Sequence, residues 1–321
     1  MFDRRVLRIL VTGAAGFIGS EFVRSLLDGK FGPVPKKVYA LDSLTYAGNL
    51  NNLVGYESRM TFIEGDIADQ GLIRDLYRKI DTVVNFAAET HVDNSIKTSI
   101  PFVNSNVLGV ANLIEHLVEF PRIRFVQVST DEVYGSIVNG SWDEKCKLEP
   151  NSPYSATKSG GDLLVKSYVS THNINASITR CCNNYGPFQH TEKLIPSFIT
   201  KVLANQELPL YGSGQNYREW IHVSDHCRAI WLVITKGQRG EIYNIGSGFE
   251  LTNLELTKMI LDYFNENYSK IIYVKDRLGH DFRYALNSNK IRNELNFKTS
   301  IPFEIGLRKT IDWYKQNTLK T

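Results

Sequence analysis

A glycine-rich turn near the N-terminus constrains the fold of this chain more than any other feature. Residues 13–19 read Gly-Ala-Ala-Gly-Phe-Ile-Gly, and the apolar run at 8–12 before them predicts a strand. Apolar residues at helical spacing follow at 17–27, so the turn joins a strand to a helix. The small residues allow backbone N–H groups to approach a pyrophosphate at the start of that helix. This combination predicts a dinucleotide-binding domain.

Strands alternate with helices through the first half of the chain, which is typical of a parallel sheet. Each predicted strand ends on a polar or glycine-rich stretch, where ligands bind in open α/β sheets. We therefore expect an α/β fold with a Rossmann-type doubly wound parallel sheet. The residue patterns predict further strands at 37–41, 61–63, 81–86, 124–128 and 176–180, and helices at 101–118 and 153–170.

The pattern changes after Asn183, where proline, glycine and aromatic residues divide the chain into shorter units. We expect residues 1–182 to form the dinucleotide-binding domain. Residues 183–321 should form a smaller mixed α/β C-terminal substrate-binding domain, packed tightly on the first, with some segments returning to it. No linker-like stretch, low-complexity tract or repeat separates the two parts.

Composition excludes several classes of function. A net charge of +3, without blocks of like charge, argues against nucleic acid. No apolar stretch predicts a membrane span, and the N-terminus lacks the pattern of a signal peptide. The four cysteines show no spaced framework, and two are adjacent, which favours reduced thiols over disulfides. We expect a cytoplasmic protein.

His222 and His226 lie four residues apart, but no accompanying ligand pattern favours a metal, so a capping or supporting role near Arg218 is preferred.

The acidic residue at the end of the second strand indicates which dinucleotide binds. Asp42 lies 23 residues after Gly19, near the spacing expected for a carboxylate that binds a ribose diol. A carboxylate there repels a 2′-phosphate, so NAD is favoured over NADP. Asp66 with Ile67 should flank the adenine, and the small pair Ala87-Ala88 lets the backbone pass close to the cofactor.

Tyr154 and Lys158 lie four apart and therefore on one face of a predicted helix. A free phenol has a pKa of ~10, too high for an efficient base at neutral pH. A lysine ammonium one turn away, together with a nicotinamide cation, stabilises the phenolate. Tyr154 is therefore expected to accept a hydroxyl proton while hydride leaves the same carbon.

Asp131 and Glu132 follow the strand at 124–128 and place two carboxyl groups beside the oxidation site. Once an alcohol has become a ketone, a base can remove the proton on the adjacent carbon. An acid can then expel a hydroxyl one carbon further on. Two carboxyl groups divide these tasks when their environments separate their pKa values. The pattern indicates an enzyme that oxidises, eliminates and reduces.

These features carry a resemblance that covers the chain from Val11 to Tyr314. It resembles the nucleoside-diphosphate-sugar 4,6-dehydratases of the extended short-chain dehydrogenase/reductase family, and most closely the members that act on dTDP-glucose. The shared motifs are TGAAGFIGS, LDSLTYAGNL, GDI, FAAETHVDNSI, STDEVYG, YSATK, RCCNNYGP, EKLIP, YNIG and DRLGHDFRYA.

The resemblance implies a mechanism. Tyr154 deprotonates the C4 hydroxyl of glucose while NAD accepts the C4 hydride, with assistance from Thr130 and Lys158. Glu132 removes the C5 proton, and Asp131 protonates the departing C6 hydroxyl. Hydride then returns to C6. The product is a 4-keto-6-deoxy sugar nucleotide for deoxysugar biosynthesis, for example of rhamnose, and NAD stays tightly bound because it is regenerated in each cycle.

The resemblance also implies the residues that bind each ligand. For the cofactor we expect Gly13, Gly16, Phe17, Ile18, Gly19, Asp42, Ser43, Leu44, Thr45, Asp66, Ile67, Ala87, Ala88, Ser105, Ser129, Tyr154, Lys158 and Asn184. For the sugar nucleotide we expect Thr90, Thr130, Asn183, Lys193, Leu194, Pro209, Tyr211, Arg218, Asn253, Arg277 and His280. The family is usually dimeric, and the apolar faces of the helices at 101–118 and 153–170 suggest a homodimer.

Alternatives remain open at this point. Thr191 stands where the family usually has proline, and Asn94 where it usually has arginine, which leaves thymidine and uridine nucleotides both possible. A sugar epimerase or decarboxylase of the same fold is disfavoured by the intact Asp131-Glu132 pair. A non-enzymatic dinucleotide-binding regulator is disfavoured because both Tyr154 and Lys158 are present.

Overall fold

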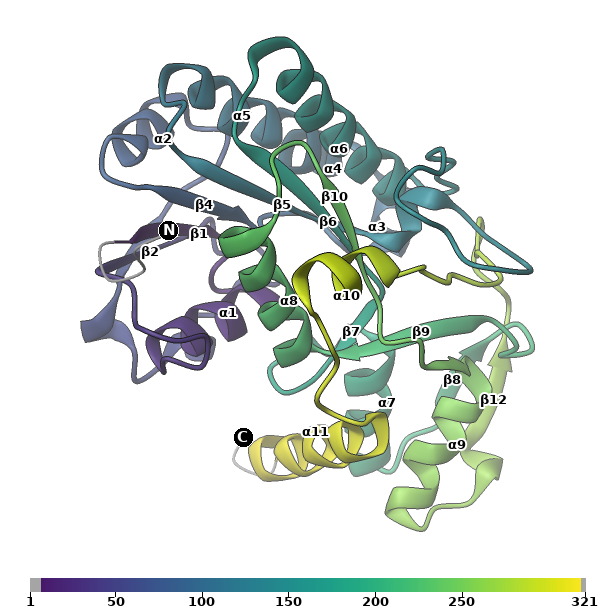
Figure 1. Ribbon diagram of the computed structural model, residues 1–321. Helices are drawn as coiled ribbons and strands as arrows, with labels where there is room; N and C mark the ends of the chain where they lie inside the picture. The colour runs from purple at the N-terminus through teal and green to yellow at the C-terminus, as the bar shows by residue number, and fades with distance from the viewer. Residues whose placement is uncertain (1–6, 319–321) are drawn as a thin grey trace.

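A seven-stranded parallel sheet forms the larger part of the structure, a computed structural model that describes residues 7–318 (Figure 1). The strands are arranged in the order β10-β6-β5-β4-β1-β2-β3. The predicted Rossmann-type doubly wound sheet is therefore confirmed. Its strands are β1 (Arg8–Thr12), β2 (Lys37–Asp42), β3 (Thr61–Glu64), β4 (Thr82–Asn85), β5 (Arg124–Thr130), β6 (Ala176–Cys181) and β10 (Ile242–Ile245).

Helices cover both faces of this sheet (Figure 1). One face carries α1 (Phe17–Leu27), α8 (Val223–Lys236) and α10 (Asn289–Leu295). The other carries α2 (Gln70–Tyr77), α5 (Val110–Glu119) and α6 (Pro153–His172). Because both faces are covered, the central strands are buried along almost their whole length, as parallel sheets require.

The predicted helix at 101–118 is confirmed as an unbroken helical segment, but its pitch changes within it. It divides into α4 (Ile100–Val103), a π-helical turn (Asn104–Gly109) and α5. Gly161 of α6 lies against this turn, so close that a Cβ there would be 2.6 Å from the carbonyl oxygen of Asn106. The Asn106 side chain bonds the backbone of Glu89 through both its oxygen and its nitrogen. Packing between helices therefore accompanies the local change in helical pitch.

The smaller part contains two short sheets beneath the carboxyl ends of the main strands. Its helices enclose a separate apolar core that includes Phe198, Trp220 and Phe303. The strand order is β11-β9-β7 in one sheet and β12-β8 in the other. The strands are β7 (Asn183–Tyr185), β8 (Leu208–Tyr211), β9 (Tyr217–His222), β11 (Glu250–Thr252) and β12 (Ile271–Val274), and the helices are α7 (Leu194–Leu203), α9 (Asn253–Phe264) and α11 (Phe303–Thr318).

Short elements complete the connections. The helix α3 (Val92–Lys97) follows β4. Among residues 7–318, 3₁₀ turns lie at Leu50–Leu53, Glu57–Arg59, Asp131–Tyr134 and Tyr268–Lys270.

The strand β10 belongs to the second half of the chain but pairs with β6 in the main sheet. The chain therefore crosses into the smaller part, returns to complete the large sheet, and leaves again. The domain boundary at residue 182 stays a prediction. Among residues 7–318, no helix combines the length and apolar character needed to cross a membrane.

Candidate active site

A cavity of about 500 Å³ lies at the carboxyl ends of β1, β2, β4 and β5. Parallel strands place their carboxyl ends at one edge of a sheet, so residues far apart in sequence meet there. The residues expected at the cofactor line this cavity with one exception, Leu44. Those lining it are Gly13, Gly16, Phe17, Ile18, Gly19, Asp42, Ser43, Thr45, Asp66, Ile67, Ala87, Ala88, Ser105, Ser129, Tyr154, Lys158 and Asn184.

The turn between β1 and α1 has the close backbone contacts that require glycine. Gly13 adopts a φ of 62°, and a Cβ there would lie 2.7 Å from the backbone nitrogen of Ala87. A Cβ on Gly19 would lie 2.1 Å from the carbonyl oxygen of Gly13. Larger residues cannot enter without displacing the backbone. The N-terminus of α1 therefore faces the cavity with its N–H groups available to an anion.

Asp42 anchors the loop that follows β2. One carboxylate oxygen accepts a hydrogen bond from the Ala15 backbone N–H at 2.8 Å, and the other accepts one from Leu44 at 2.8 Å. Leu44 itself has a φ of 50° and contributes its backbone to this turn. The carboxylate lines the cavity at the position expected for recognition of a ribose.

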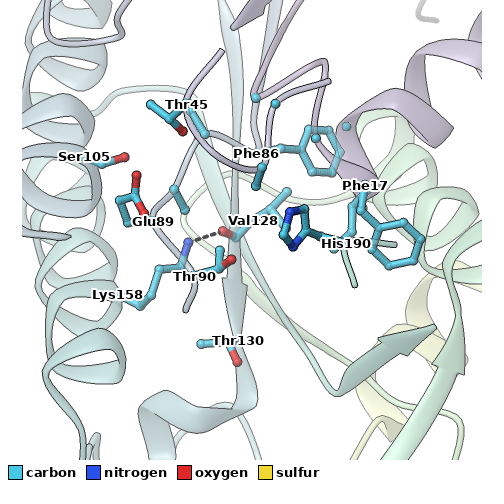
Figure 2. A pocket seen from close by; sticks show the side chains of 18 of the residues that line it. Phe17, Thr45, Phe86, Glu89, Thr90, Ser105, Val128, Thr130, Lys158 and His190 are labelled. Atoms are coloured by element: carbon cyan, nitrogen blue, oxygen red, sulfur yellow. Dashed lines mark hydrogen bonds between the residues drawn. The ribbon is translucent and has the colours of Figure 1, made fainter. Parts of the chain in front are cut away.

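Tyr154 and Lys158 enter the same cavity from the first turns of α6. Ser152 caps this helix, and a capping box with Ser155 fixes where the helix begins. Lys158 Nζ donates to the Val128 carbonyl at 2.8 Å, across to the end of β5 (Figure 2). Burial lowers the pKa of Lys158 to about 8.

The pKa of Tyr154 moves in the direction opposite to the one expected from its lysine neighbour. Burial raises it well above the ordinary value, and the negative charges of Glu132 and Asp131 raise it further. A hydrogen bond with Thr130 offsets part of this rise. Lys158 Nζ is held by the Val128 carbonyl of β5, and the expectation that Lys158 and a nicotinamide cation together stabilise the phenolate stays a prediction.

Asp131 and Glu132 begin the 3₁₀ turn that follows β5, beside Tyr154. Thr130 donates to one oxygen of Asp131 at 3.1 Å, whereas the other oxygen is buried and has no partner among the described residues. Burial and the charge of Glu132 raise the pKa of Asp131 well above its usual range. Burial also raises the pKa of Glu132, but Arg277, Arg218 and Lys193 counteract that rise. The two carboxyl groups therefore occupy different electrostatic environments.

A second cavity of about 360 Å³ adjoins the first on the side of the smaller part. Glu132, Asn183 and Lys193 line both cavities. Thr90 and Thr130 line the first cavity. The other residues expected at the sugar nucleotide line the second: Leu194, Pro209, Tyr211, Arg218, Asn253, Arg277 and His280.

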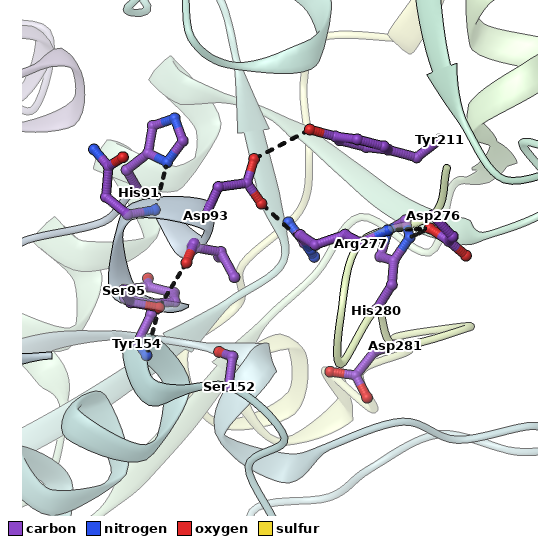
Figure 3. A network of polar contacts seen from close by, with 12 residues as sticks. His91, Asp93, Ser95, Ser152, Tyr154, Tyr211, Asp276, Arg277, His280 and Asp281 are labelled. Carbon is purple, nitrogen blue, oxygen red and sulfur yellow. Dashed lines mark hydrogen bonds and ion pairs between the residues drawn. The ribbon is translucent and has the colours of Figure 1, made fainter. Parts of the chain in front are cut away.

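Polar contacts hold the wall of the second cavity in place (Figure 3). Asp93 of α3 accepts a hydrogen bond from the Tyr211 hydroxyl at 3.3 Å and lies 3.8 Å from the guanidinium of Arg277. His280 contacts Asp276 at 2.6 Å. These contacts join three segments that are distant in sequence. The side chain of Arg277 makes its ion pair with Asp93.

Sequence reasoning did not select several residues that line these cavities. Glu192 contacts Lys193 at 3.4 Å, His91 at 3.5 Å and the Tyr46 hydroxyl at 3.5 Å. Its position in the EKLIP motif was the available signal. The other unselected residues include Glu89, Asn104, Cys181, His190 and His226 in the first cavity and Trp220 and Tyr284 in the second.

The two histidines of α8 have different roles. His222 caps the helix, since its Nδ1 accepts from the Ser224 backbone N–H at 3.3 Å. His226 contacts the Asn184 side chain at 2.9 Å through its Nδ1 and lines the first cavity, so the expected place near Arg218 is wrong for His226. Within residues 7–318, no cluster of three or more potential ligands has the arrangement of a metal site.

Comparisons with known proteins agree with this arrangement. Residues 10–310 match the family model for GDP-mannose 4,6 dehydratase. A dTDP-glucose 4,6-dehydratase from Streptomyces niveus is 50% identical over 97% of this chain and 94% of its own length. The crystal structure of a dTDP-glucose 4,6-dehydratase from Streptomyces venezuelae, with NAD bound, has a TM-score of 0.95 and 52% identity, with 98% of each chain covered.

A third relative is more distant but has the same architecture. The dTDP-glucose 4,6-dehydratase from Bacillus anthracis, solved in complex with NAD, has a TM-score of 0.91 and 42% identity over 98% of both chains. The resemblance drawn from the motifs is therefore confirmed over nearly the full chain. This chain belongs to the GDP-mannose 4,6 dehydratase family.

Proposed function

We propose that this protein is an NAD-dependent dTDP-glucose 4,6-dehydratase, a hydro-lyase. The observation that carries the proposal is the position of Tyr154, Asp131 and Glu132 in the first cavity, with Glu132 reaching the second. The base for the oxidation and two carboxyl groups thus lie where the cavity proposed for the dinucleotide meets the cavity proposed for the sugar nucleotide. The relatives from Streptomyces niveus and Streptomyces venezuelae bear the same activity in their names.

The first cavity suits NAD. The crowded glycine turn leaves backbone N–H groups of α1 for the pyrophosphate, and Asp42 offers a carboxylate for a ribose diol. The NAD-bound structures of the relatives support the same assignment. When bound, NAD supplies a hydride acceptor and later a hydride donor.

The oxidation begins at Tyr154. Its phenolate oxygen accepts the proton of the C4 hydroxyl, and Thr130 shares the hydrogen-bonding network. Lys158 fixes the geometry of this end of the cavity through its bond to the Val128 carbonyl. Because burial opposes the phenolate, a positively charged nicotinamide beside it favours proton transfer only when the cofactor is oxidised.

The elimination divides between the two carboxyl groups. Glu132 removes the C5 proton, since Arg277, Arg218 and Lys193 favour its charged form. Asp131 donates a proton to the departing C6 hydroxyl, because burial and Glu132 keep it protonated. The environments separate the acid from the base, as this chemistry requires. Water leaves, C6 then accepts the hydride, and C5 is reprotonated.

The second cavity supplies the contacts to the nucleotide. Lys193, Arg218 and Arg277 place positive charge around it and suit a diphosphate. Tyr211 and His280 offer flat faces for a base and meet edge to face, with ring centroids 6.2 Å apart. Asn253 has a buried side-chain oxygen without a partner in the described structure, which suits a hydrogen-bond donor of the ligand.

Mass spectrometry of separate incubations with dTDP-glucose, UDP-glucose and GDP-mannose tests this function. The purified protein is used without added NAD, because a regenerated cofactor remains bound. We expect loss of one water from dTDP-glucose only. If water is lost from UDP-glucose and not from dTDP-glucose, the proposed mechanism is retained but the nucleotide of the substrate is different. No reaction with any sugar nucleotide, even with NAD added, contradicts the proposal.

We also propose a cytoplasmic homodimer. Apolar side chains on α4, on the π-helical turn that follows it and on α6 are exposed, including Ile100 at 64%, Leu108 at 55% and Leu163 at 52%. These are large exposures for aliphatic side chains and suit a helix-to-helix interface. Leu108→Glu should give a monomer by sedimentation, whereas the wild-type chain should sediment as a dimer. A wild-type monomer contradicts this part of the proposal.

The proposed cytoplasmic location is supported by the cysteines. All four are free, which suits a reducing compartment.

A further inference from the structure

A group of nucleophilic and titratable side chains at the end of β6 has no task in the proposed reaction. Cys181 ends this strand and lines the first cavity together with Cys182, Asn184 and His226. Both cysteines are only 3% exposed, so their access to solvent is through the cavity. His226 is 1% exposed, and its Nε2 is buried without a hydrogen-bond partner among the described residues.

Asn184 joins the thiol to the histidine. Its side-chain nitrogen donates to the Cys181 sulfur at 3.3 Å and to the Cys182 carbonyl at 3.1 Å. Its side-chain oxygen is 2.9 Å from Nδ1 of His226. Since an amide oxygen only accepts, His226 donates from Nδ1, and this fixes the amide with its N–H groups toward the sulfur. The sulfur thus receives a hydrogen bond that favours its anionic form.

We propose that Cys181 is a nucleophilic thiolate in the cavity wall and the site at which small oxidants of the hydroperoxide class modify this protein. The sulfur bonds to one peroxide oxygen as the O–O bond breaks, and it is oxidised to a sulfenic acid. The leaving hydroxide takes a proton from solvent and departs as water. No metal or further reductant is needed for this step.

The charges around the thiol support the proposal. Burial favours the neutral thiol, but a hydrogen bond from Cys182 and the charge and hydrogen bonding of His226, with Asn184, lower the pKa of Cys181 to about 5. The other titratable groups that face Cys181 are Asp131, Glu219, Cys182 and Cys227. Burial raises the pKa of each of them, which reduces the negative charge opposing the thiolate.

The other cysteines provide matched controls. Cys146 is more accessible than Cys181, but burial raises the pKa of its thiol, and it donates a hydrogen bond to Asp143 at 3.3 Å. Cys227 is fully buried, and burial raises its pKa well above the ordinary value. Modification of Cys227 therefore reports unfolding rather than reactivity.

The test treats the purified holoprotein with dilute hydrogen peroxide and dimedone between pH 6 and pH 9, and quantifies the adduct on each cysteine peptide by mass spectrometry. The reactive thiolate fraction of a cysteine already ionised at pH 6 changes little with pH, whereas that of an ordinary thiol with a pKa of about 8.5 rises roughly two hundredfold. We expect the ratio of Cys181 to Cys146 adduct to fall at least roughly a hundredfold over this range. A constant or rising ratio, or no adduct on Cys181 at any pH, overturns the proposal.

Three variants separate the chemistry from folding and from catalysis. Cys182→Ser keeps a hydroxyl donor beside Cys181 but removes the neighbouring thiol, which would react with a sulfenic acid on Cys181. The dimedone adduct on Cys181 should therefore increase in this variant. His226→Gln should reduce the ratio at pH 6 at least roughly tenfold, provided Cys227 stays unmodified. Tyr154→Phe, which prevents turnover, should retain the wild-type ratio. The proposal therefore stands or fails independently of the dehydratase function.

Discussion

At the scale of single residues, burial determines the charge of the catalytic groups more strongly than their immediate partners. Tyr154, Asp131 and Glu132 all line one cavity, and burial raises the pKa of each. What distinguishes them is the surrounding charge. Glu132 faces the cationic second cavity, whereas Asp131 faces its neighbouring carboxylate. In the proposed mechanism, the neighbouring residues Asp131 and Glu132 can therefore act as acid and base, respectively, because the charges around them differ.

The first prediction concerns Glu132→Gln. This variant removes the proposed base for C5 and also one of the negative charges that raise the pKa of Tyr154. Oxidation at C4 should therefore persist, while release of dehydrated product falls roughly 10²–10⁴-fold. Near-ultraviolet absorbance should show reduced cofactor accumulating on substrate addition, and mass spectrometry should show little loss of water. Unchanged product release contradicts the assignment.

The second prediction concerns the pH dependence of elimination. Asp131 acts in its protonated form, and its pKa lies well above the usual range because of burial and Glu132. The rate of water loss should therefore fall as pH rises through this raised pKa, and it should also fall on acidification, because the base Glu132 then becomes protonated. In Asp131→Asn the rate of water loss should be low at every pH, and the decrease at high pH that depends on Asp131 should be absent. A pH–rate profile for single turnovers, followed by rapid quench, measures both.

At the scale of elements, local signals located β1 to β6, α1 and α6 closely, whereas no bounds were predicted for the elements after residue 183. The helix α6 shows why: Ser152 and Pro153 mark its start, and Asn173 in the left-handed conformation, with a φ of 58°, marks its end. The strands β1 and β5 begin where apolar runs begin. The π-helical turn at Asn104–Gly109 was not predictable, because it accompanies the approach of Gly161 from another helix.

The candidate site was predictable to a similar extent. Tyr154, Lys158, Asp131 and Glu132 were selected from spacing and the ends of strands. The second cavity was available only through resemblance, because its wall combines residues of many elements. The contact between Asp93 and Arg277 connects positions that no local pattern relates.

The third prediction tests the helix contact. Gly161→Ala places a Cβ 2.6 Å from the Asn106 carbonyl oxygen, which is backbone and cannot rotate away. The variant should lose about 1–3 kcal/mol of unfolding free energy. Gly160→Ala is the matched control, because its nearest neighbour is a side-chain methyl of Val107 at 3.3 Å. It should be nearly neutral in thermal or urea unfolding; equal losses in both variants contradict the explanation.

At the scale of the whole molecule, a buried carboxyl group joins segments of the smaller part. Glu219 of β9 accepts hydrogen bonds from the backbone N–H groups of Gly248 at 2.7 Å and Leu286 at 3.2 Å. Burial nevertheless raises its pKa from 4.5 to about 7. The folded chain therefore retains a proton here that the unfolded chain has lost at mildly acidic pH.

The fourth prediction follows from that proton. A raised folded-state pKa stabilises the protein fully below the unfolded value and loses this effect as pH rises through the folded value. Glu219 should therefore contribute a decrease in unfolding free energy of up to roughly 3 kcal/mol between pH 4.5 and pH 7. Glu219→Gln resembles the protonated form, so its urea-unfolding curves should vary less over this window. A variant with the same pH dependence as wild type contradicts this account.

The return of β10 to the main sheet has a consequence for the synthesis of the chain. Residues up to Cys181 leave the ribosome before Ile242–Ile245 has been made, so β6 is then an open edge with unpaired backbone groups. The nascent sheet has to wait for the intervening segment before that edge can close. Chains interrupted before Ile242 should therefore associate edge to edge, whereas complete chains bury β6 between two partners.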